Sequence, residues 1–560
     1  MMQKKRTKAI KPKLKLIPLG GLGEIGKNMM VAEYGNDIII IDCGVMFPEE
    51  DMMGIDLVIP DISYLLERKD KIRGIVITHA HEDHIGALPY ILPQLNVPIY
   101  CTRLAKGLIS VKLKEGKALN DAQINVIEPG GTFPLGCFKI EFFPVCHSIP
   151  DAVGLIIETP LGLVVHTGDF KLDYTPVYGE PTSLSRLSQV GSKGVLLLLS
   201  DSTHAETPGY TPSEKVIGEA LDTIISRAKG RVIVATFASL ISRIQQVIDA
   251  AANHGRKVFV FGRSMSDNVK MALELGYLKA PDGVLGKGEE LRGLPPEKIV
   301  MITTGSQGEP TSALVRIANH GHRQVSIIKG DTVVVSASPI PGNESLVNRT
   351  IDSLFKQGAE VFYDQLSKVH VHGHASQEEL KLVLNLVKPR FFVPVHGEFR
   401  HLTLHSRLAL DAGVEEKNIF RLEDGDVLEL SANSGRVAGR VTSGHVYVDG
   451  LSVGDVGGVV LRNRRMLSKD GIVVVIIAVN QQTGKLVSRP DIVSRGFVDM
   501  VEAKDMIEEG KDLVATIVDH RGKREADLSS ADSRVRDELN RFFFEKTKRR
   551  PMILPVLVKV

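Results

Sequence analysis

The sequence lacks tryptophan, has only four cysteines, and carries almost no net charge. The cysteines (Cys43, Cys101, Cys137 and Cys146) show no CxxC spacing, so we expect no disulfide framework. A formal net charge of +2 over 560 residues means that any affinity for nucleic acid must come from a local basic surface. No apolar run approaches the roughly 20 residues of a membrane span, and no secretory signal opens the chain. We therefore expect a cytoplasmic protein without a membrane partner.

Length and composition describe a globular protein of several domains. Apolar residues make up 43% and charged residues 24% of the 560 residues, which is ordinary for a folded soluble chain. At about 150 residues per domain, three or four units are expected.

The densest group of chemically active side chains is the stretch Thr78-His79-Ala80-His81-Glu82-Asp83-His84. An apolar run before it, Ile75 to Ile77, predicts a buried strand, and Ile85 to Leu92 predicts the start of a helix after a tight turn. A lone histidine is usually a surface residue or a satisfied core group. Three histidines and an aspartate at one strand end offer the imidazole nitrogens and carboxylate oxygen that zinc and manganese accept.

The pattern His-x-His-x-Asp-His after an apolar strand resembles the signature of the metallo-β-lactamase superfamily, whose members hydrolyse very different substrates. Two later strand ends, around His147 and Asp169, carry further residues of the ligand type. The resemblance implies that His147 is a ligand and that Asp169 bridges two metals.

A glycine-rich stretch, Gly21-Leu22-Gly23-Glu24-Ile25-Gly26, formally matches the dinucleotide-binding fingerprint. That fingerprint needs a crossover helix before the next strand, and residues 28–34 are too few for one. Gly35-Asn36-Asp37 instead predicts a hairpin turn into Ile38 to Ile41. Asp42 ends that strand, and the resemblance implies a carboxylate that holds a ligand imidazole from behind. The alternative is a simple turn residue.

Later motifs narrow the resemblance to the β-CASP branch and, within it, to the ribonuclease J family. Asp201 ends an apolar strand, and that branch carries an acidic residue there, placed behind the metal ligands. His374 and His396 match the two late histidines of the branch, and the C-terminal residues 545–555 also resemble the family. Two positions depart from it: His204 stands where an asparagine is typical, and His372 where serine is common.

Several strand ends in residues 216–369 carry small polar clusters that suit phosphate contacts. Each cluster alone is more often a simple turn, but together they favour a phosphate-lined cleft. The candidates for binding the 5′-terminal phosphate of RNA are residues 370–374 together with Ser239, Arg263 and Ser306. If residues 370–374 are extended, His370, His372 and His374 share one face, and Gly373 would let the backbone approach the phosphate. The complete list of predicted substrate contacts is His370, Val371, His372, Gly373, His374, Ser239, Arg263 and Ser306.

The predicted fold is α/β: a metallo-β-lactamase αββα sandwich with an inserted doubly wound β-CASP domain and a small α+β C-terminal domain. The expected boundaries are a basic flexible arm (1–15), the first part of the sandwich (16–215), the β-CASP domain (216–369), the second part of the sandwich (370–450), a linker (451–464) and an assembly domain (465–560).

The resemblance implies two divalent metal ions, zinc in the first place, with manganese or magnesium as alternatives. The implied ligands are His79, His81, Asp83, His84, His147, Asp169 and His396. Asp83 and His374 are the expected catalytic residues, Asp83 to orient the attacking water and His374 to protonate the leaving 3′ oxygen.

The implied activity is RNA cleavage, both 5′→3′ exonucleolytic with a preference for 5′-monophosphate ends and endonucleolytic, in rRNA processing and mRNA decay. The products carry a 5′-phosphate and a 3′-hydroxyl. Single-stranded RNA is the expected partner, with assembly into a homodimer or homotetramer and contacts to other RNA-decay proteins.

Three other functions make different predictions from those above. A DNA-processing β-CASP nuclease would cleave DNA and RNA equally, since RNA preference requires contacts to the 2′-hydroxyl. A catalytically inactive RNA-binding scaffold would show a degraded ligand set, whereas here every ligand position is filled. A small-ester or β-lactam hydrolase would leave the inserted domain and the late histidines without a purpose.

Overall fold

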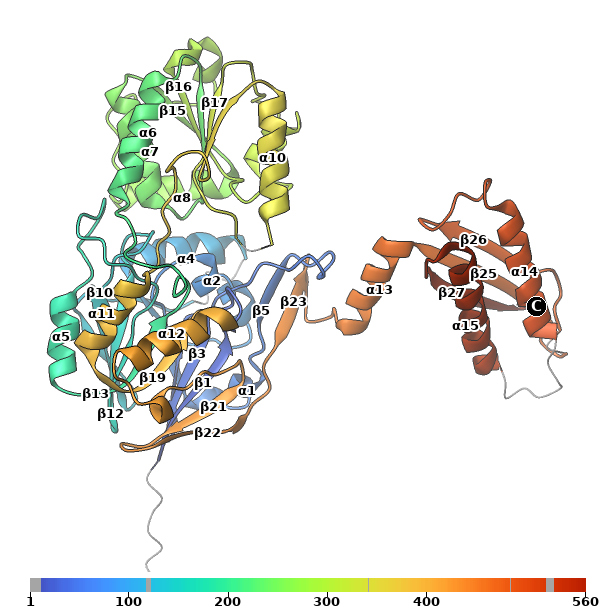
Figure 1. Ribbon diagram of the computed structural model, residues 1–560, viewed down its shortest axis with the longest axis horizontal. Coiled ribbons are helices and arrows are strands. Elements are labelled where there is room, and N and C mark those ends of the chain that lie inside the picture. The colour runs from blue at the N-terminus through green and yellow to red at the C-terminus, as the bar shows by residue number, and fades with distance from the viewer. Residues whose placement is uncertain (1–11, 117–121, 341, 484, 520–527) are drawn as a thin grey trace, which may run out of the picture. The chain divides into compact units, whose positions relative to one another are not determined.

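The computed structural model describes residues 12–116, 122–340, 342–483, 485–519 and 528–560 (Figure 1). Contacts divide the chain into two compact units, the first comprising Met1–Phe47 and Leu57–Val446, the second Pro48–Asp56 and Tyr447–Val560. Within the described ranges, no helix is both long enough and apolar enough to cross a membrane. Most of the expected basic arm, residues 1–11, lies outside the described residues.

The first unit is built on two large sheets. In spatial order, the eight-stranded sheet comprises β22 (Gly435–Arg440), β21 (Asp426–Leu430), β1 (Leu14–Gly20), β3 (Met29–Tyr34), β4 (Asp37–Ile41), β6 (Ile72–Val76), β7 (Ile99–Cys101) and β8 (Ile124–Val126). The six-stranded sheet comprises β19 (Pro389–Val395), β13 (Val195–Asp201), β12 (Gly162–His166), β11 (Val153–Thr159), β10 (Phe138–Pro144) and β9 (Thr132–Leu135).

The two sheets face each other across one apolar core. Ile39 and Ile41 from one sheet and Leu197 and Leu199 from the other belong to the same buried cluster. Strand β13 is buried at all seven residues because its opposite face, which includes Leu198, packs against helices. A strand covered on both faces needs an uninterrupted apolar run, which explains the sequence Val195-Leu-Leu-Leu-Leu199.

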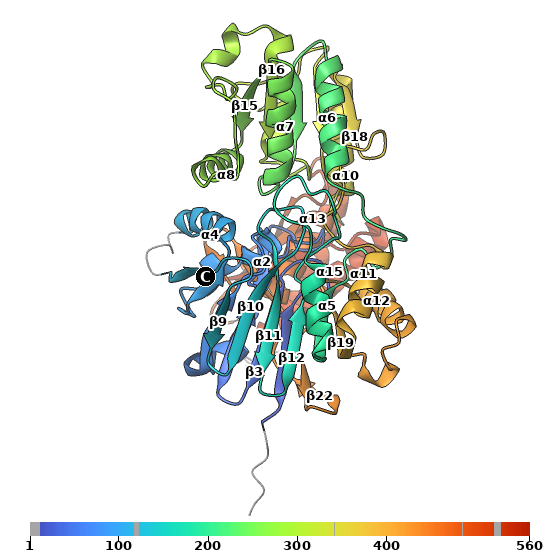
Figure 2. The same ribbon diagram turned by 90° about the vertical axis from the view of Figure 1, so that its left-hand side faces the viewer.

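Helices cover the outer face of the six-stranded sheet. Figure 2 shows α5 beside β12, with α11 and α12 beside β19, and Val190 of α5 and Val383 of α11 join the cluster behind that sheet. The helices of this part of the chain are α1 (Ser63–Leu66), α2 (Glu82–Ile85), α3 (Leu88–Ile91), α4 (Arg103–Glu115), α5 (Leu184–Ser192), α11 (Gln377–Val387) and α12 (Phe399–Asp411). Short strands complete it: β2 (Leu22–Gly23), which pairs with β20 (Gly397–Glu398), and β5 (Leu57–Pro60).

A third sheet, which is fully parallel, is inserted in the chain between β13 and β19. Its order is β15 (Lys257–Phe261), β16 (Ile299–Thr303), β14 (Val232–Ala235), β17 (Thr332–Val335) and β18 (Glu360–Tyr363). Helices lie on both faces, with α6 and α7 on one side and α10 on the other (Figure 1). The helices are α6 (Lys215–Arg227), α7 (Ile241–Asn253), α8 (Arg263–Glu274), α9 (Ala313–Ala318) and α10 (Glu344–Lys356).

The second unit contains a small three-stranded sheet in the order β26 (Asp491–Arg495), β25 (Ile472–Val479) and β27 (Met552–Lys559). One face packs on helices through Val473, Val475 and Phe543. The remaining elements are β23 (His445–Asp449), which pairs with β24 (Ser452–Val453), and helices α13 (Gly458–Asp470), α14 (Lys504–Asp519) and α15 (Leu528–Thr547).

The predicted fold class is therefore confirmed, including the hairpin from β3 into β4, which are antiparallel neighbours. One local prediction differs from the structure. The residues after the His-rich motif form two single helical turns, α2 and α3, instead of one helix that begins at Ile85. Pro89 lies in the first turn of α3, where its missing N–H costs nothing, and it cannot continue a helix from α2.

Candidate metal centre

The predicted ligands converge although they come from distant parts of the chain. They lie at or just beyond the ends of five elements: His79 and His81 after β6, Asp83 and His84 within α2, His147 after β10, Asp169 after β12, and His396 directly after β19. These strands end at one edge of the sandwich, so their polar termini meet there. His396 follows Asp83 by more than 300 residues, yet His396 Nε2 lies 3.3 Å from Asp83 Oδ2.

The first group contains three imidazoles. His79 Nε2 and His147 Nε2 each lie 3.1 Å from His81 Nδ1. Two nitrogens bound at 2.0–2.1 Å to one tetrahedral zinc ion are about 3.3 Å apart. The three nitrogens therefore have the spacing of ligands that share one metal ion.

The second group combines two imidazoles with two carboxylates. His84 Nε2 lies 3.2 Å from Asp169 Oδ2 and 3.4 Å from Asp83 Oδ2. His396 completes the group through its contacts with both carboxylates, and all four ligand atoms fall within 4.8 Å of one another. Asp169 Oδ2 is also 3.6 Å from His79 Nε2 of the first group, so this carboxylate lies between the two candidate positions.

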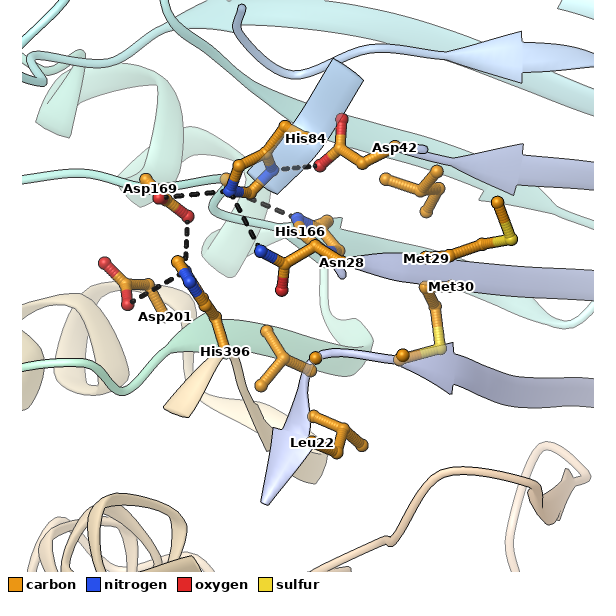
Figure 3. A pocket seen from close by; sticks show the side chains of 15 residues that line it. Leu22, Asn28, Met29, Met30, Asp42, His84, His166, Asp169, Asp201 and His396 are labelled. Carbon is orange, nitrogen blue, oxygen red and sulfur yellow. Dashed lines mark hydrogen bonds and ion pairs between the residues drawn. The ribbon is translucent and has the colours of Figure 1, made fainter. Parts of the chain in front are cut away.

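Hydrogen bonds on the far side of the rings select which nitrogen faces the centre. Figure 3 shows His84 between Asp42 and Asp169, with its Nδ1 2.8 Å from Asp42 Oδ2. His147 Nδ1 donates to the Gly373 carbonyl at 2.7 Å. In both rings Nε2 is therefore the nitrogen that would coordinate a metal ion. His396 Nε2 is buried and has no hydrogen-bond partner in the described chain, which also fits a ligand atom.

The protonation states of the first group of imidazoles and of Asp169 suit metal binding. Burial, together with the neighbouring imidazoles, lowers the pKa of His79 and His147 well below the usual value, and it lowers the pKa of His81 to about 4. Burial alone would raise the pKa of Asp169, but the imidazoles of His396 and His84 outweigh it and hold the pKa well below its usual value. Neutral imidazoles and ionised carboxylates are the forms that coordinate a cation. At His84 and His396 burial would lower the pKa, but the Asp169 carboxylate outweighs it and raises the pKa, to about 10 for His396, so a cation must displace a proton from each of these rings.

Two residues of the site hold unusual backbone conformations. Asp42 has φ 63° and His396 has φ 54°, the left-handed region that non-glycine residues rarely adopt. Such conformations cost about 1–3 kcal/mol and persist where the surrounding contacts determine them. The Thr78 N–H and hydroxyl, which donate to the two Asp42 oxygens at 2.8 and 2.9 Å, provide those contacts for Asp42.

The pair Asp201 and His374 lies beside the second group. His374 Nδ1 is 2.8 Å from Asp201 Oδ2, and the Asp201 Oδ1 atom accepts from the Thr203 N–H at 3.0 Å. Burial lowers the pKa of His374, but the Asp201 carboxylate outweighs burial and the net shift is upward. Asp201 thus lies against the predicted catalytic histidine, while Asp42 lies against a predicted ligand.

The loop of residues 369–376 is anchored at three carbonyls. The Val369 carbonyl accepts from Arg243 Nη1 at 3.0 Å and from the Ser336 hydroxyl at 2.6 Å. Further along, the Gly373 carbonyl accepts from His147, and the His374 carbonyl accepts from Thr211 Oγ1 at 2.7 Å. The loop therefore connects the inserted domain, through Arg243 and Ser336, to the first group of imidazoles.

The residues predicted to contact phosphate differ in their exposure and in their neighbours. A Cβ on Gly373 would lie 2.5 Å from His147 Cε1, so the glycine makes room for that imidazole. The close approach of its backbone to phosphate stays a prediction. Val371 and Ser306 are buried, at 9% and 2% exposure, whereas Arg263 is exposed and begins helix α8. Among the described contacts, none joins Ser239, Arg263 or Ser306 to the imidazole groups.

Sequence reasoning missed three contributors. Asn28 Nδ2 lies 3.2 Å from His84 Nε2 and donates to the Asp83 carbonyl at 3.1 Å. Arg243 and Thr211 anchor the histidine loop. Nothing around these residues resembles a ligand motif, and only the contacts reveal them.

A cavity of about 20 Å³ lies beside the second group. Its lining includes Met30, His84 and His166, and it has room for about one water molecule (Figure 3).

Family models match four successive parts of the chain. They are described as the metallo-beta-lactamase superfamily (residues 22–202), the ribonuclease J beta-CASP domain (229–354), the Zn-dependent metallo-hydrolase RNA specificity domain (363–420) and the ribonuclease J C-terminal domain (459–560). Ribonuclease J 1 of Streptococcus pyogenes is 45% identical over 541 residues, 96% of each chain. Ribonuclease J2 of Bacillus subtilis is 44% identical over 560 residues, all of both chains.

The chain belongs to the ribonuclease J family. The relationship extends to ribonuclease J of Thermus thermophilus, 44% identical over 98% of this chain and 95% of that one. A solved structure of a protein of unknown function from Enterococcus faecalis aligns with a TM-score of 0.52 at 16% identity, covering 75% of this chain and 100% of that chain, and it supports the fold alone. A member of the ribonuclease J family with this centre is a metal-dependent hydrolase that cleaves RNA.

Proposed function

We propose that the chain is a two-metal RNA phosphodiesterase with 5′→3′ exonuclease activity, preferring 5′-monophosphate ends, and with endonuclease activity. Its products would carry a 5′-phosphate and a 3′-hydroxyl, and its role would be RNA maturation and decay. All four cysteines are free, which is consistent with the proposed place of action, the reducing cytoplasm.

The observation that carries this proposal is the position of Asp169. Its carboxylate oxygens lie 2.9 Å from His396 Nδ1, 3.2 Å from His84 Nε2 and 3.6 Å from His79 Nε2. A carboxylate shared between two ligand groups is the arrangement expected where two cations lie about 3.5–4 Å apart, the separation used for in-line phosphoryl displacement.

The donor set fits two divalent cations. His79, His81 and His147 would hold one, Asp83, His84 and His396 the other, and Asp169 both. Zinc is the first choice for a site rich in imidazole, with manganese or magnesium as the alternatives. When bound, the cations lower the pKa of water and offset the negative charge that develops on the phosphate.

The remaining steps belong to side chains of this protein. Asp83 would orient the attacking water, a role supported by its Oδ2 atom, which lies 3.4 Å from His84 Nε2 and 3.3 Å from His396 Nε2. His374 would protonate the leaving 3′ oxygen. The Nδ1 atom of His374 is held by Asp201 at 2.8 Å, so its Nε2 atom is the one that can act on the substrate.

The 5′ end of the RNA is proposed to bind along residues 370–374, with Ser239, Arg263 and Ser306 as further candidate contacts. The loop carries His374 at its end, so a terminal phosphate bound there would lie close to the reacting bond. Arg263, exposed at the N-terminus of α8, is the most accessible of the three remaining candidates.

Incubation of 5′-monophosphate and 5′-triphosphate RNA with the protein, with and without chelator, tests the proposal. We expect mononucleotides from the monophosphate RNA, slower internal cleavage of the triphosphate RNA, and neither in chelator. Cleavage of neither RNA, or cleavage that chelator leaves intact, would overturn it.

The variant Asp83→Ala/His84→Ala should abolish cleavage. Asp222→Ala is the matched control, since Asp222 is a half-exposed carboxylate of the inserted domain whose side chain contacts Asn253 and His254. Full activity in the double variant would contradict the assignment of Asp83 and His84 to the metal centre.

Assembly into a homodimer or homotetramer is proposed to use the open face of the sheet β26-β25-β27. Leu554, Val556 and Val558 are 46%, 38% and 42% exposed, and Ile476 on the neighbouring strand is 38% exposed. An apolar face of this kind suits a second copy of the chain. Other RNA-decay proteins are further candidate partners.

A further inference from the structure

The two positions that depart from the family pattern, His204 and His372, are in direct contact. Their rings stack with centroids 3.6 Å apart and an interplanar angle of 5°. His204 also faces His374, with centroids 5.8 Å apart and an angle of 26°. The three rings form a short column that ends at the predicted catalytic histidine.

Each stacked ring is supported by its own segment. His204 Nδ1 lies 3.2 Å from the Thr207 hydroxyl, in the turn that follows β13. His372 belongs to the loop whose Val369 carbonyl is held by Arg243 and Ser336. Among the described contacts His372 itself has no hydrogen bond, and its Nδ1 atom is buried without a partner. Among the described ring contacts, the one that restrains the plane of the His372 ring is its stack on His204.

Burial favours the neutral form of both rings. Burial lowers the pKa of His204 to about 4 and the pKa of His372 to about 2. Because the buried Nδ1 atom of His372 cannot reach a ligand, Nε2 is the nitrogen that can donate a hydrogen bond without movement of the ring.

We propose that His204 is a positioning residue that holds the His372 ring so that its Nε2 donates to the 5′-terminal phosphate of the RNA. This inference rests on the proposed function, because that function assigns the 5′ end of the RNA to the loop of residues 369–376. It predicts that His204 and His372 act as one unit in 5′-end recognition and that neither has an independent effect.

A double-mutant cycle tests the unit. The protein loaded with metal is titrated with two RNA oligonucleotides, one with a 5′-monophosphate and one with a 5′-hydroxyl, both with phosphorothioate linkages that slow cleavage. The readout is the ratio of the two dissociation constants. Because the readout is binding, a protein that binds with 5′ preference but does not cleave would contradict the proposed function and leave this inference standing.

We expect His204→Ala and His372→Ala each to reduce the 5′-phosphate preference about tenfold, and the double variant to reduce it no further. His204→Phe, which keeps a flat ring against His372, should retain most of the preference. His322→Ala is the matched control, since His322 packs its ring on Phe261 in the inserted domain, and it should leave the ratio unchanged.

Losses that add in the double variant, or a His204→Ala ratio equal to that of the unmodified protein, would overturn the proposal. A merely structural role would instead lower the melting temperature of His204→Ala and weaken binding of both RNAs equally. That outcome also counts against it.

Discussion

At the scale of single residues, Asp42 shows how a carboxylate that need not touch the metal or the substrate can control a metal site. It accepts the Thr78 N–H at 2.8 Å and lies 2.8 Å from His84 Nδ1, so both of its oxygens are committed to donors. We propose that this contact keeps a proton on His84 Nδ1 when a cation binds, so that Nε2 is the nitrogen that coordinates it.

Replacement of Asp42 by asparagine should therefore weaken metal binding about 10–100-fold. Asparagine tolerates the left-handed backbone at φ 63°, so the fold should be kept. Its amide N–H₂ must face either the Thr78 N–H or His84 Nδ1, and the second choice forces the His84 proton onto Nε2. Competition with a chromophoric chelator measures the affinity, with Asp222→Asn as the control. Unchanged affinity would show that Asp42 does not select the ring nitrogen.

At the scale of elements, the loop of residues 369–376 joins the inserted parallel sheet to the metal centre. Arg243, on α7, is fully buried and donates to Glu214 at 2.8 Å as well as to the Val369 carbonyl. Movement of α7 would shift Val369, and through the loop it would shift the Gly373 carbonyl that holds His147.

Arg243→Lys should lower RNA cleavage at least about tenfold, which corresponds to about 1.4 kcal/mol of lost positioning. A lysine ammonium cannot hold Glu214 and Val369 with the geometry of the guanidinium fork. Arg256→Lys is the matched control, because Arg256 is also a buried arginine that donates to backbone carbonyls, at Gly230 and Ala228. Both variants should lose stability in thermal unfolding. Equal cleavage by the two would contradict the coupling.

The difference between Asp42 and Arg243 shows how much of the site can be predicted from the sequence. Asp42 could be proposed from its place at a strand end, because strand ends are found from apolar periodicity and their polar residues gather at one edge. The predicted metal ligands also follow strands, but the resemblance to the family assigned most of them, and it assigned the role of Asp42. Arg243 lies inside an ordinary amphipathic helix, and its partner Val369 is 126 residues away. Contacts made only by folding, including the His204–His372 stack, leave no local pattern.

At the scale of the whole molecule, the open face of the sheet β26-β25-β27 is the surface proposed for assembly. Residues 553 and 554 illustrate the alternation of β27, since Ile553 is 5% exposed and Leu554 is 46% exposed. The buried face packs on helices, and the other presents valine and leucine to solvent.

Val556→Lys should convert the proposed assembly to monomers, because a charge at the centre of this face cannot be buried without a partner. Size-exclusion chromatography with light scattering measures the mass, and melting of the second unit should change little since Val556 is already 38% exposed. Val501→Lys, at a position 85% exposed in the same unit, is the control. An unchanged mass for Val556→Lys would place the interface elsewhere.

The order of strands in the two large sheets has a consequence for how the protein is made. Strand β13 lies beside β19, and β1 lies beside β21, yet β19 and β21 are translated only after the whole inserted sheet. A nascent chain on the ribosome must therefore keep the β13 edge unfilled through synthesis of about a third of its length, and the β1 edge for longer. His396 emerges with the late strand, so a growing polypeptide lacks a complete set of ligands until that strand is in place. A nuclease assembled in this sequence stays inert beside the message that encodes it.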